Sequence, residues 1–166
     1  LEKATSDTSA NSRERAAESS IPVQVVLTAI ADMFLDDMQA RGKRFRVRPS
    51  LTVMNANPMV VTRIVSNFVA NALQYSGKGG VLVGIRRNAG RAFIAVYDTG
   101  PGMDRETLER VLRRAERGDI DNATQGKGLG LDIALSLARQ HGLETIAESV
   151  PGKGSLFAVA IRAGKI

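Results

Sequence analysis

Hydrophobic residues recur at helical and at strand spacing along this chain, and the most regular helical run lies between residues 58 and 76. Asn57 suits the N-cap of that helix, and Pro58 suits its first position, where no backbone N–H is needed. Apolar residues then recur every three or four positions, which is the period of a helix buried along one face. The residues predicted on its buried face are Val61, Ile64, Val65, Phe68, Val69, Ala72 and Leu73.

The same reasoning predicts further helices and strands along the chain. Helical spacing occurs over residues 23–40, 105–114 and 129–140, and short strands are expected within residues 45–54, 81–85, 92–98, 143–150 and 155–161. The turn at Asn88, Ala89 and Gly90 predicts a hairpin. We therefore expect an α/β (α+β) fold, a two-layer sandwich in which helices cover one face of a single mixed sheet.

The composition bounds the domain organisation. A chain of 166 residues with 43% hydrophobic residues can bury a core of its own. It has no cysteine, which excludes disulfides and thiolate zinc sites, and it contains neither a run of membrane-spanning length nor a secretory signal. Residues 1–20 are polar and are interpreted as a linker or the truncated end of a helix, and residues 21–166 as one domain.

The net charge of +6 raises the question of nucleic-acid binding. The densest basic run, residues 41–48, has Phe45 and Val47 at alternate positions, which also suits an exposed strand with one buried face. Aromatic residues make up only 4% of the chain, so a base-stacking platform is not expected. Phosphates on a small ligand, or an acidic protein partner, would account for the charge equally well.

Two asparagines on the helix at residues 58–76 stand out. Asn67 and Asn71 are four positions apart, so their amides lie one above the other on the polar face. Asparagine is a poor helix former, and a solvent-exposed polar stripe is the simplest explanation for the pair. An amide oxygen is also a suitable ligand for Mg²⁺, which combines a few protein oxygens with water and substrate phosphates.

Asp98 ends the predicted strand at residues 92–98, on the same face as Ile94 and Val96. A carboxylate at the end of a buried row, followed by Gly100 and Gly102, can accept a hydrogen bond from an exocyclic amine such as that of adenine. The sequence Asp-Thr-Gly-Pro-Gly is also good turn chemistry without any ligand.

Three glycines, Gly126, Gly128 and Gly130, lead directly into the helix predicted at residues 129–140. Backbone N–H groups at such a helix start bind anions, and glycine lets a phosphate approach closely, although such turns are often purely structural. The spacing does not match a P-loop, because Lys127 is followed by glycine. It does not match the dinucleotide fingerprint either, because no strand precedes it.

Taken in order, the asparagine helix, the Asp-x-Gly-x-Gly segment, a polar loop and the glycine-rich helix start resemble the catalytic and ATP-binding domain of sensor histidine kinases. That domain belongs to the GHKL, or Bergerat, ATPase superfamily, which includes gyrase and the heat-shock ATPases. The resemblance covers residues 21–161. It implies a protein-histidine kinase that uses ATP and Mg²⁺, with residues 103–125 forming a mobile lid over the nucleotide.

The resemblance also implies roles for individual residues. Asn67 and Asn71 correspond to the family's N box and are the implied catalytic residues, with Asn71 as the Mg²⁺ ligand. Asp98 corresponds to the aspartate that binds adenine, and Tyr75 to an aromatic residue near the base. The implied nucleotide-binding set is Asn67, Asn71, Tyr75, Asp98, Gly100, Gly102, Met103, Lys127, Gly128, Leu129 and Gly130. Arg113, Arg114, Arg117 and Lys127 could reach the phosphates from the lid, or could simply be solvated.

One position separates the branches of the superfamily. Hydrolytic members and the anti-sigma serine kinases carry a glutamate where this chain has Asn67, and an amide cannot take a proton from the attacking group. This favours transfer of the γ-phosphoryl group to a histidine supplied by a dimerisation domain outside this chain. A GHKL-type ATPase, a serine kinase and a degenerate nucleotide sensor are the alternatives.

The implied partners are that dimerisation and phosphotransfer domain and a response regulator, with no nucleic acid and no membrane insertion by this fragment. The implied location is the cytoplasm, including the cytoplasmic part of an anchored receptor. His141 stands before Gly142 at a predicted helix end, where a surface cap is the expected role.

Overall fold

The computed structural model describes residues 20–117 and 129–162. Its main element is a five-stranded sheet in the order β2-β4-β5-β7-β6. The strands are β2 (Arg44–Val47), β4 (Gly80–Asn88), β5 (Arg91–Asp98), β6 (Thr145–Val150) and β7 (Gly154–Ile161). Only β2 and β4 are parallel; the other neighbours are antiparallel, so the sheet is mixed as predicted.

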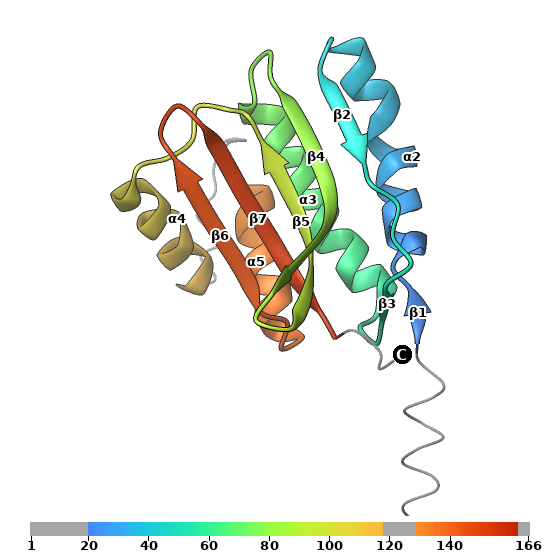
Figure 1. Ribbon diagram of the computed structural model, residues 1–166. Coiled ribbons are helices and arrows are strands. Elements are labelled where there is room, and N and C mark those ends of the chain that lie inside the picture. The colour runs from blue at the N-terminus through green and yellow to red at the C-terminus, as the bar shows by residue number, and fades with distance from the viewer. Residues whose placement is uncertain (1–19, 118–128, 163–166) are drawn as a thin grey trace, which may run out of the picture.

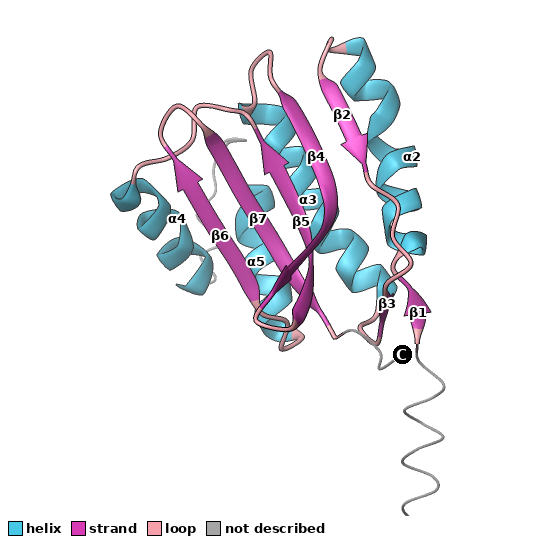
Figure 2. Cartoon of the chain, viewed as in Figure 1, coloured by secondary structure: helices cyan, strands magenta, loops and turns pink. Residues whose placement is uncertain are grey.

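The helices lie on one face of this sheet, as Figure 1 shows. They are α2 (Gln24–Ala40), α3 (Pro58–Tyr75), α4 (Arg105–Arg117) and α5 (Leu129–Gln140). A two-stranded ladder of β1 (Ile21–Pro22) and β3 (Val53–Met54) lies beside them (Figure 2). The predicted two-layer fold is therefore confirmed. Within the described ranges, none of the helices has the length and apolar character needed to cross a bilayer.

The helix α3 forms as its sequence predicts and carries the centre of the core. Asn57 caps it, with Oδ1 accepting from the N–H groups of Met59 at 2.9 Å and Val60 at 3.4 Å. All seven residues predicted on its apolar face are buried. Phe68 stacks on Phe157 of β7, with 5.7 Å between ring centroids. This packing fixes the rotation of α3, and hence the direction of its polar stripe.

On the opposite face of the sheet, the described residues form no helix and a smaller hydrophobic cluster is buried. Phe93, Ala95 and Ala158 belong to this cluster and are fully buried. Arg86 on β4 reaches Glu148 on β6, with 3.0 Å between Nη1 and Oε2, so this ion pair crosses the two strands between them.

Some predicted boundaries are wrong by a few residues. Residue 116, predicted in a loop, lies in α4, because the apolar face of that helix continues to the buried Ala115. The strand expected from residue 143 begins at Thr145. The basic run forms the edge strand β2, with exposed arginines alternating with half-buried Phe45 and Val47, which confirms the strand interpretation. The predicted linker falls almost wholly outside the described residues.

Candidate functional site

The polar stripe of α3 faces a cavity of about 360 Å³ between α3, the end of β5 and α4. Asn71 and Tyr75 line it from successive turns of the helix. Asn67 lies one turn earlier, and its Nδ2 donates to the carbonyl of Arg63 at 2.7 Å. A Cβ added at Gly130 of α5 would lie 3.3 Å from the Asn67 Oδ1. The amide therefore presents its oxygen to the start of α5.

Asp98 lines the same cavity from the end of β5. Its Oδ1 accepts the N–H of Gly100 at 2.8 Å. Burial raises the pKa of the Asp98 carboxyl, and hydrogen bonds from the backbone N–H groups of Gly100 and Ser155 oppose this in part. A half-buried carboxylate with these fixed donors is oriented in advance and retains accepting capacity for a ligand.

The loop after Asp98 is packed so closely that glycine is required. A Cβ at Gly100 would lie 2.8 Å from both the Asp98 Oδ1 and the Tyr75 carbonyl oxygen. Gly102 has a φ of +66°, and a Cβ there would lie 2.0 Å from the carbonyl oxygen of Val150. The N–H of Met103 donates to the Ser149 Oγ at 2.7 Å. The hairpin of β6 and β7 thus holds this wall of the cavity through the Ser149 hydroxyl and the closely packed Val150 carbonyl.

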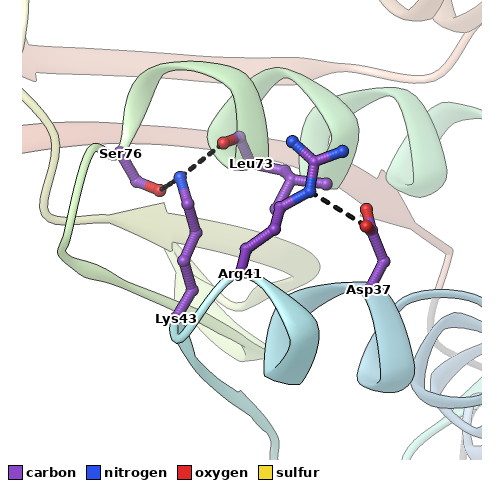
Figure 3. Close-up of polar contacts among 5 residues, drawn as sticks. All are labelled: Asp37, Arg41, Lys43, Leu73 and Ser76. Atoms are coloured by element: carbon purple, nitrogen blue, oxygen red, sulfur yellow. Dashed lines mark hydrogen bonds and ion pairs between the residues drawn. The ribbon is translucent and has the colours of Figure 1, made fainter.

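A lysine from outside the cavity secures the end of α3, as Figure 3 shows. The Nζ of Lys43 donates to the carbonyl of Leu73 at 2.6 Å and contacts the Ser76 Oγ at 3.0 Å. Helix α3 has no basic residue in its last turn, so Lys43 supplies the cation that its C-terminal carbonyls favour. It stabilises the turn between Asn71 and Tyr75 that faces the cavity.

Helix α4 forms the remaining wall. Asp104 caps it, with Oδ1 accepting from the N–H of Thr107 at 2.7 Å, and this bond lowers the pKa of the Asp104 carboxyl. Four of its residues face the cavity, at positions i, i+3, i+4 and i+7: Thr107, Arg110, Val111 and Arg114. The Arg114 Nε contacts the Oδ2 of Asp132 on α5 at 2.8 Å. The wall therefore carries two guanidinium groups.

The structure brings most of the predicted site residues together. Asn71, Tyr75, Asp98, Gly102 and Met103 line one cavity, and Gly100 lies directly behind Asp98. Asn67 and Gly130 lie next to each other. Gly126, Lys127 and Gly128 fall outside the described residues, and Leu129 begins α5.

Sequence reasoning missed several lining residues. Thr107, Arg110 and Val111 share one helical face with Arg114, and this spacing could have identified them once α4 was placed over the site. Among the four basic lid candidates, Arg114 lines the cavity, Arg113 is exposed, and neither the Arg117 side chain nor Lys127 is described. Ser155 lies opposite Asp98 through the register of β5 and β7, for which the sequence carried no signal.

Metal ligands are sparse in the described ranges. They contain no group of three histidine or acidic side chains that could hold a metal ion by itself. Asn71 is the lining residue whose amide oxygen suits a hard cation. A divalent ion here would need ligand oxygens from a bound phosphate as well, and a chamber of about 360 Å³ has room for such a ligand.

Comparisons with known proteins agree with this arrangement. The family model described as "Histidine kinase-, DNA gyrase B-, and HSP90-like ATPase" matches residues 56–165. The chain is 38% identical over 117 residues to the sensor-like histidine kinase SenX3 of Mycobacterium bovis, covering 69% of this chain and 28% of that protein. It is 31% identical over 142 residues to the sensor histidine kinase ZraS of Klebsiella oxytoca, covering 83% of this chain and 30% of that protein.

Solved structures show the same fold. Full-length ShkA in complex with AMPPNP has a TM-score of 0.70 and 25% identity, over 89% of this chain and 32% of that one. This chain spans less than a third of the length of SenX3 and ZraS. The motifs, the fold and the matched residues lead to one assignment: the chain belongs to the histidine kinase-, DNA gyrase B- and HSP90-like ATPase family.

Proposed function

We propose that this domain binds Mg-ATP in the cavity between α3 and α4 and transfers the γ-phosphoryl group to a histidine on a separate dimerisation domain. The proposal depends on one observation, that residues from distant parts of the sequence line the same cavity. Residues from three separate segments, Asn71, Asp98 and Met103, face one chamber whose far wall carries the guanidinium groups of Arg110 and Arg114. Such a chamber combines a purine acceptor, a metal ligand and positive charge for phosphates.

At the base end, Asp98 accepts the exocyclic amine of adenine. Its orientation is fixed by the Gly100 N–H, so little is lost in ordering it when the base binds. Tyr75 is 43% exposed at the rim and lies beside the base. Gly100 and Gly102 keep the floor free of side chains.

At the phosphate end, Asn71 supplies an amide oxygen to Mg²⁺ together with the phosphates. An ion held there would supply positive charge that offsets the charge of the phosphates. Asn67 has its Nδ2 engaged with the Arg63 carbonyl, so its Oδ1 is the atom available toward the start of α5. For Gly126, Lys127 and Gly128, which lie outside the described residues, and for Leu129, we propose the phosphate contacts that the family resemblance implies.

Transfer to an external nucleophile follows from the chemistry of Asn67. An amide cannot remove a proton from water, so this domain positions ATP and does not activate a hydrolytic water. His141 is not the acceptor, because it follows α5 while Leu131, near the start of α5, lines the cavity, a separation of about 15 Å along the helix. The acceptor histidine belongs to the dimerisation domain, and a response regulator receives the phosphate afterwards.

Calorimetric titration of the 166-residue chain with a non-hydrolysable ATP analogue tests the proposal. We expect binding that weakens about tenfold or more when Mg²⁺ is removed. Asn71→Ala should weaken binding only when Mg²⁺ is present, whereas the control Gln39→Ala, at an exposed amide on α2, should change neither titration. Equal affinity of the Asn71→Ala and unaltered chains in Mg²⁺ would exclude the metal role.

Transfer is tested by adding a histidine-bearing dimerisation domain to the chain with Mg-ATP. The phosphate that appears on the acceptor should be acid-labile, as phosphohistidine is. Acid-stable phosphate on the partner, or rapid ATP hydrolysis by the chain alone, would instead support the serine kinase or ATPase alternatives.

A further inference from the structure

A buried carboxylate on α5 lies next to the nucleotide cavity without lining it. Asp132 is only 7% exposed, in the first turn of the helix. Its Oδ2 holds the Nε of Arg114 at 2.8 Å, and in the described part of the chain its Oδ1 is buried without a hydrogen-bond partner. Burying a charged group with an unsatisfied oxygen costs folding free energy, so packing alone does not explain why an aspartate occupies this position.

The partner of Asp132 belongs to the cavity. Arg114 lines the chamber on the same face of α4 as Thr107 and Arg110, and 43% of its side chain is exposed. The pair therefore connects a buried position in the first turn of α5 with the cavity wall. A flexible, half-exposed arginine loses rotamer entropy when it binds a phosphate, and holding it at Nε reduces that loss.

Other contacts already hold α4 against α5, so this ion pair is not needed to join the two helices. Arg139 already donates to the carbonyls of Ala115 at 2.9 Å and Glu116 at 2.7 Å, which ties the end of α4 to α5. Leu108 and Val111 of α4 also pack against the main core. An apolar residue at position 132 would join the helices with a smaller desolvation cost.

We propose that Asp132 is a positioning residue that holds the Arg114 guanidinium at the cavity wall for the phosphate groups of a nucleotide. The inference rests on the proposed nucleotide site and adds a residue that does not itself touch the ligand. Asp132 engages Nε, and a guanidinium carries further N–H donors of the kind that bind phosphates. Without Arg114, the Asp132 carboxylate would repel the phosphates, so the two residues act as one unit.

The test compares Mg-ATP with adenosine, which lacks phosphates, for the 166-residue chain and three variants. Asp132→Asn keeps the shape of the side chain and should weaken ATP binding about fivefold, and Arg114→Gln about thirtyfold. The double variant should bind ATP no worse than Arg114→Gln alone, because the uncompensated carboxylate is gone. Adenosine affinity, followed by NMR titration, should change less than about twofold in all three.

The control is Glu109→Gln, which also removes the carboxylate partner of an α4 arginine, Arg105, but in an exposed pair outside the cavity. It should leave both affinities unchanged. Wild-type ATP affinity in Asp132→Asn, or equal weakening of ATP and adenosine, would overturn the positioning role. If the unaltered chain binds neither ligand, the proposed function itself fails, which is a separate outcome.

Discussion

The two ends of the cavity are built in different ways. The base end, around Asp98 and Gly102, is held by hydrogen bonds from backbone N–H groups to side chains and by contacts that leave no room for a methyl group. The phosphate end, around Arg114, is held by a side-chain ion pair between two helices. Close packing around the backbone fixes a shape, whereas an ion pair fixes the position of a charged group. We therefore expect steric changes to damage the base end and charge changes to damage the phosphate end.

The largest effect is expected for Gly102→Ala. Its Cβ would lie 2.0 Å from the Val150 oxygen at a φ of +66°, so the hairpin or the loop must move, at a cost of about 3 kcal/mol of folding free energy. Gly142→Ala is the matched control, because its φ is +64° with nothing within 4 Å of the added Cβ, and it should cost about 1 kcal/mol. Urea denaturation of both variants measures the difference; equal losses would mean that the base end is not tightly packed.

Asp98→Asn should have the next largest effect, on binding and not on folding. Loss of the charged acceptor should weaken ATP binding about thirtyfold. The ligand-free chain should be as stable as before or more stable, because burial of the charge is relieved. Asp36→Asn, at an exposed carboxylate on α2, is the control. Calorimetry and thermal denaturation together check this, and normal ATP binding by Asp98→Asn would count heavily against the site.

Lys43→Met tests whether the base end depends on the contacts of Lys43 with the end of α3. The Leu73 carbonyl and the Ser76 hydroxyl lose their donor, so we expect a loss of about 1 kcal/mol of stability and a small fall in ATP affinity. Arg41→Met removes a neighbouring exposed ion pair with Asp37 and should cost less than about 0.5 kcal/mol. Denaturation midpoints of the two variants should therefore differ; identical midpoints would show that Lys43 is dispensable.

The smallest effect is a pH dependence. Burial raises the pKa of Asp98 above its unfolded value, so the folded chain holds this proton more tightly. The stability contributed by the protonated form is complete below the unfolded pKa and is lost as pH rises through the folded pKa. The Asp98→Asn variant has no carboxyl at this position, so it does not lose this stability as the pH rises. The stability of the variant relative to the unaltered chain should therefore increase as pH rises from about 4 toward neutrality; a constant difference would contradict the raised pKa.

The sequence predicted the directions of side chains within one element better than the contacts between distant segments. The period of α3 and the alternation of β5 decide which way Asn71 and Asp98 point, and both directions follow from local rules. The role of Ser155 depends on the register of β7 against β5, and the Arg114–Asp132 pair depends on how α4 packs on α5. These are tertiary contacts between distant segments, and no local pattern specifies them.

A crystal structure of the 166-residue chain with Mg²⁺ and a non-hydrolysable ATP analogue tests the central claim most directly. The account predicts the adenine amine on the Asp98 carboxylate, the metal ion on the Asn71 oxygen and the phosphates within reach of Arg114. A nucleotide bound elsewhere, or a cavity closed by the protein's own side chains while nucleotide is in excess, would contradict it.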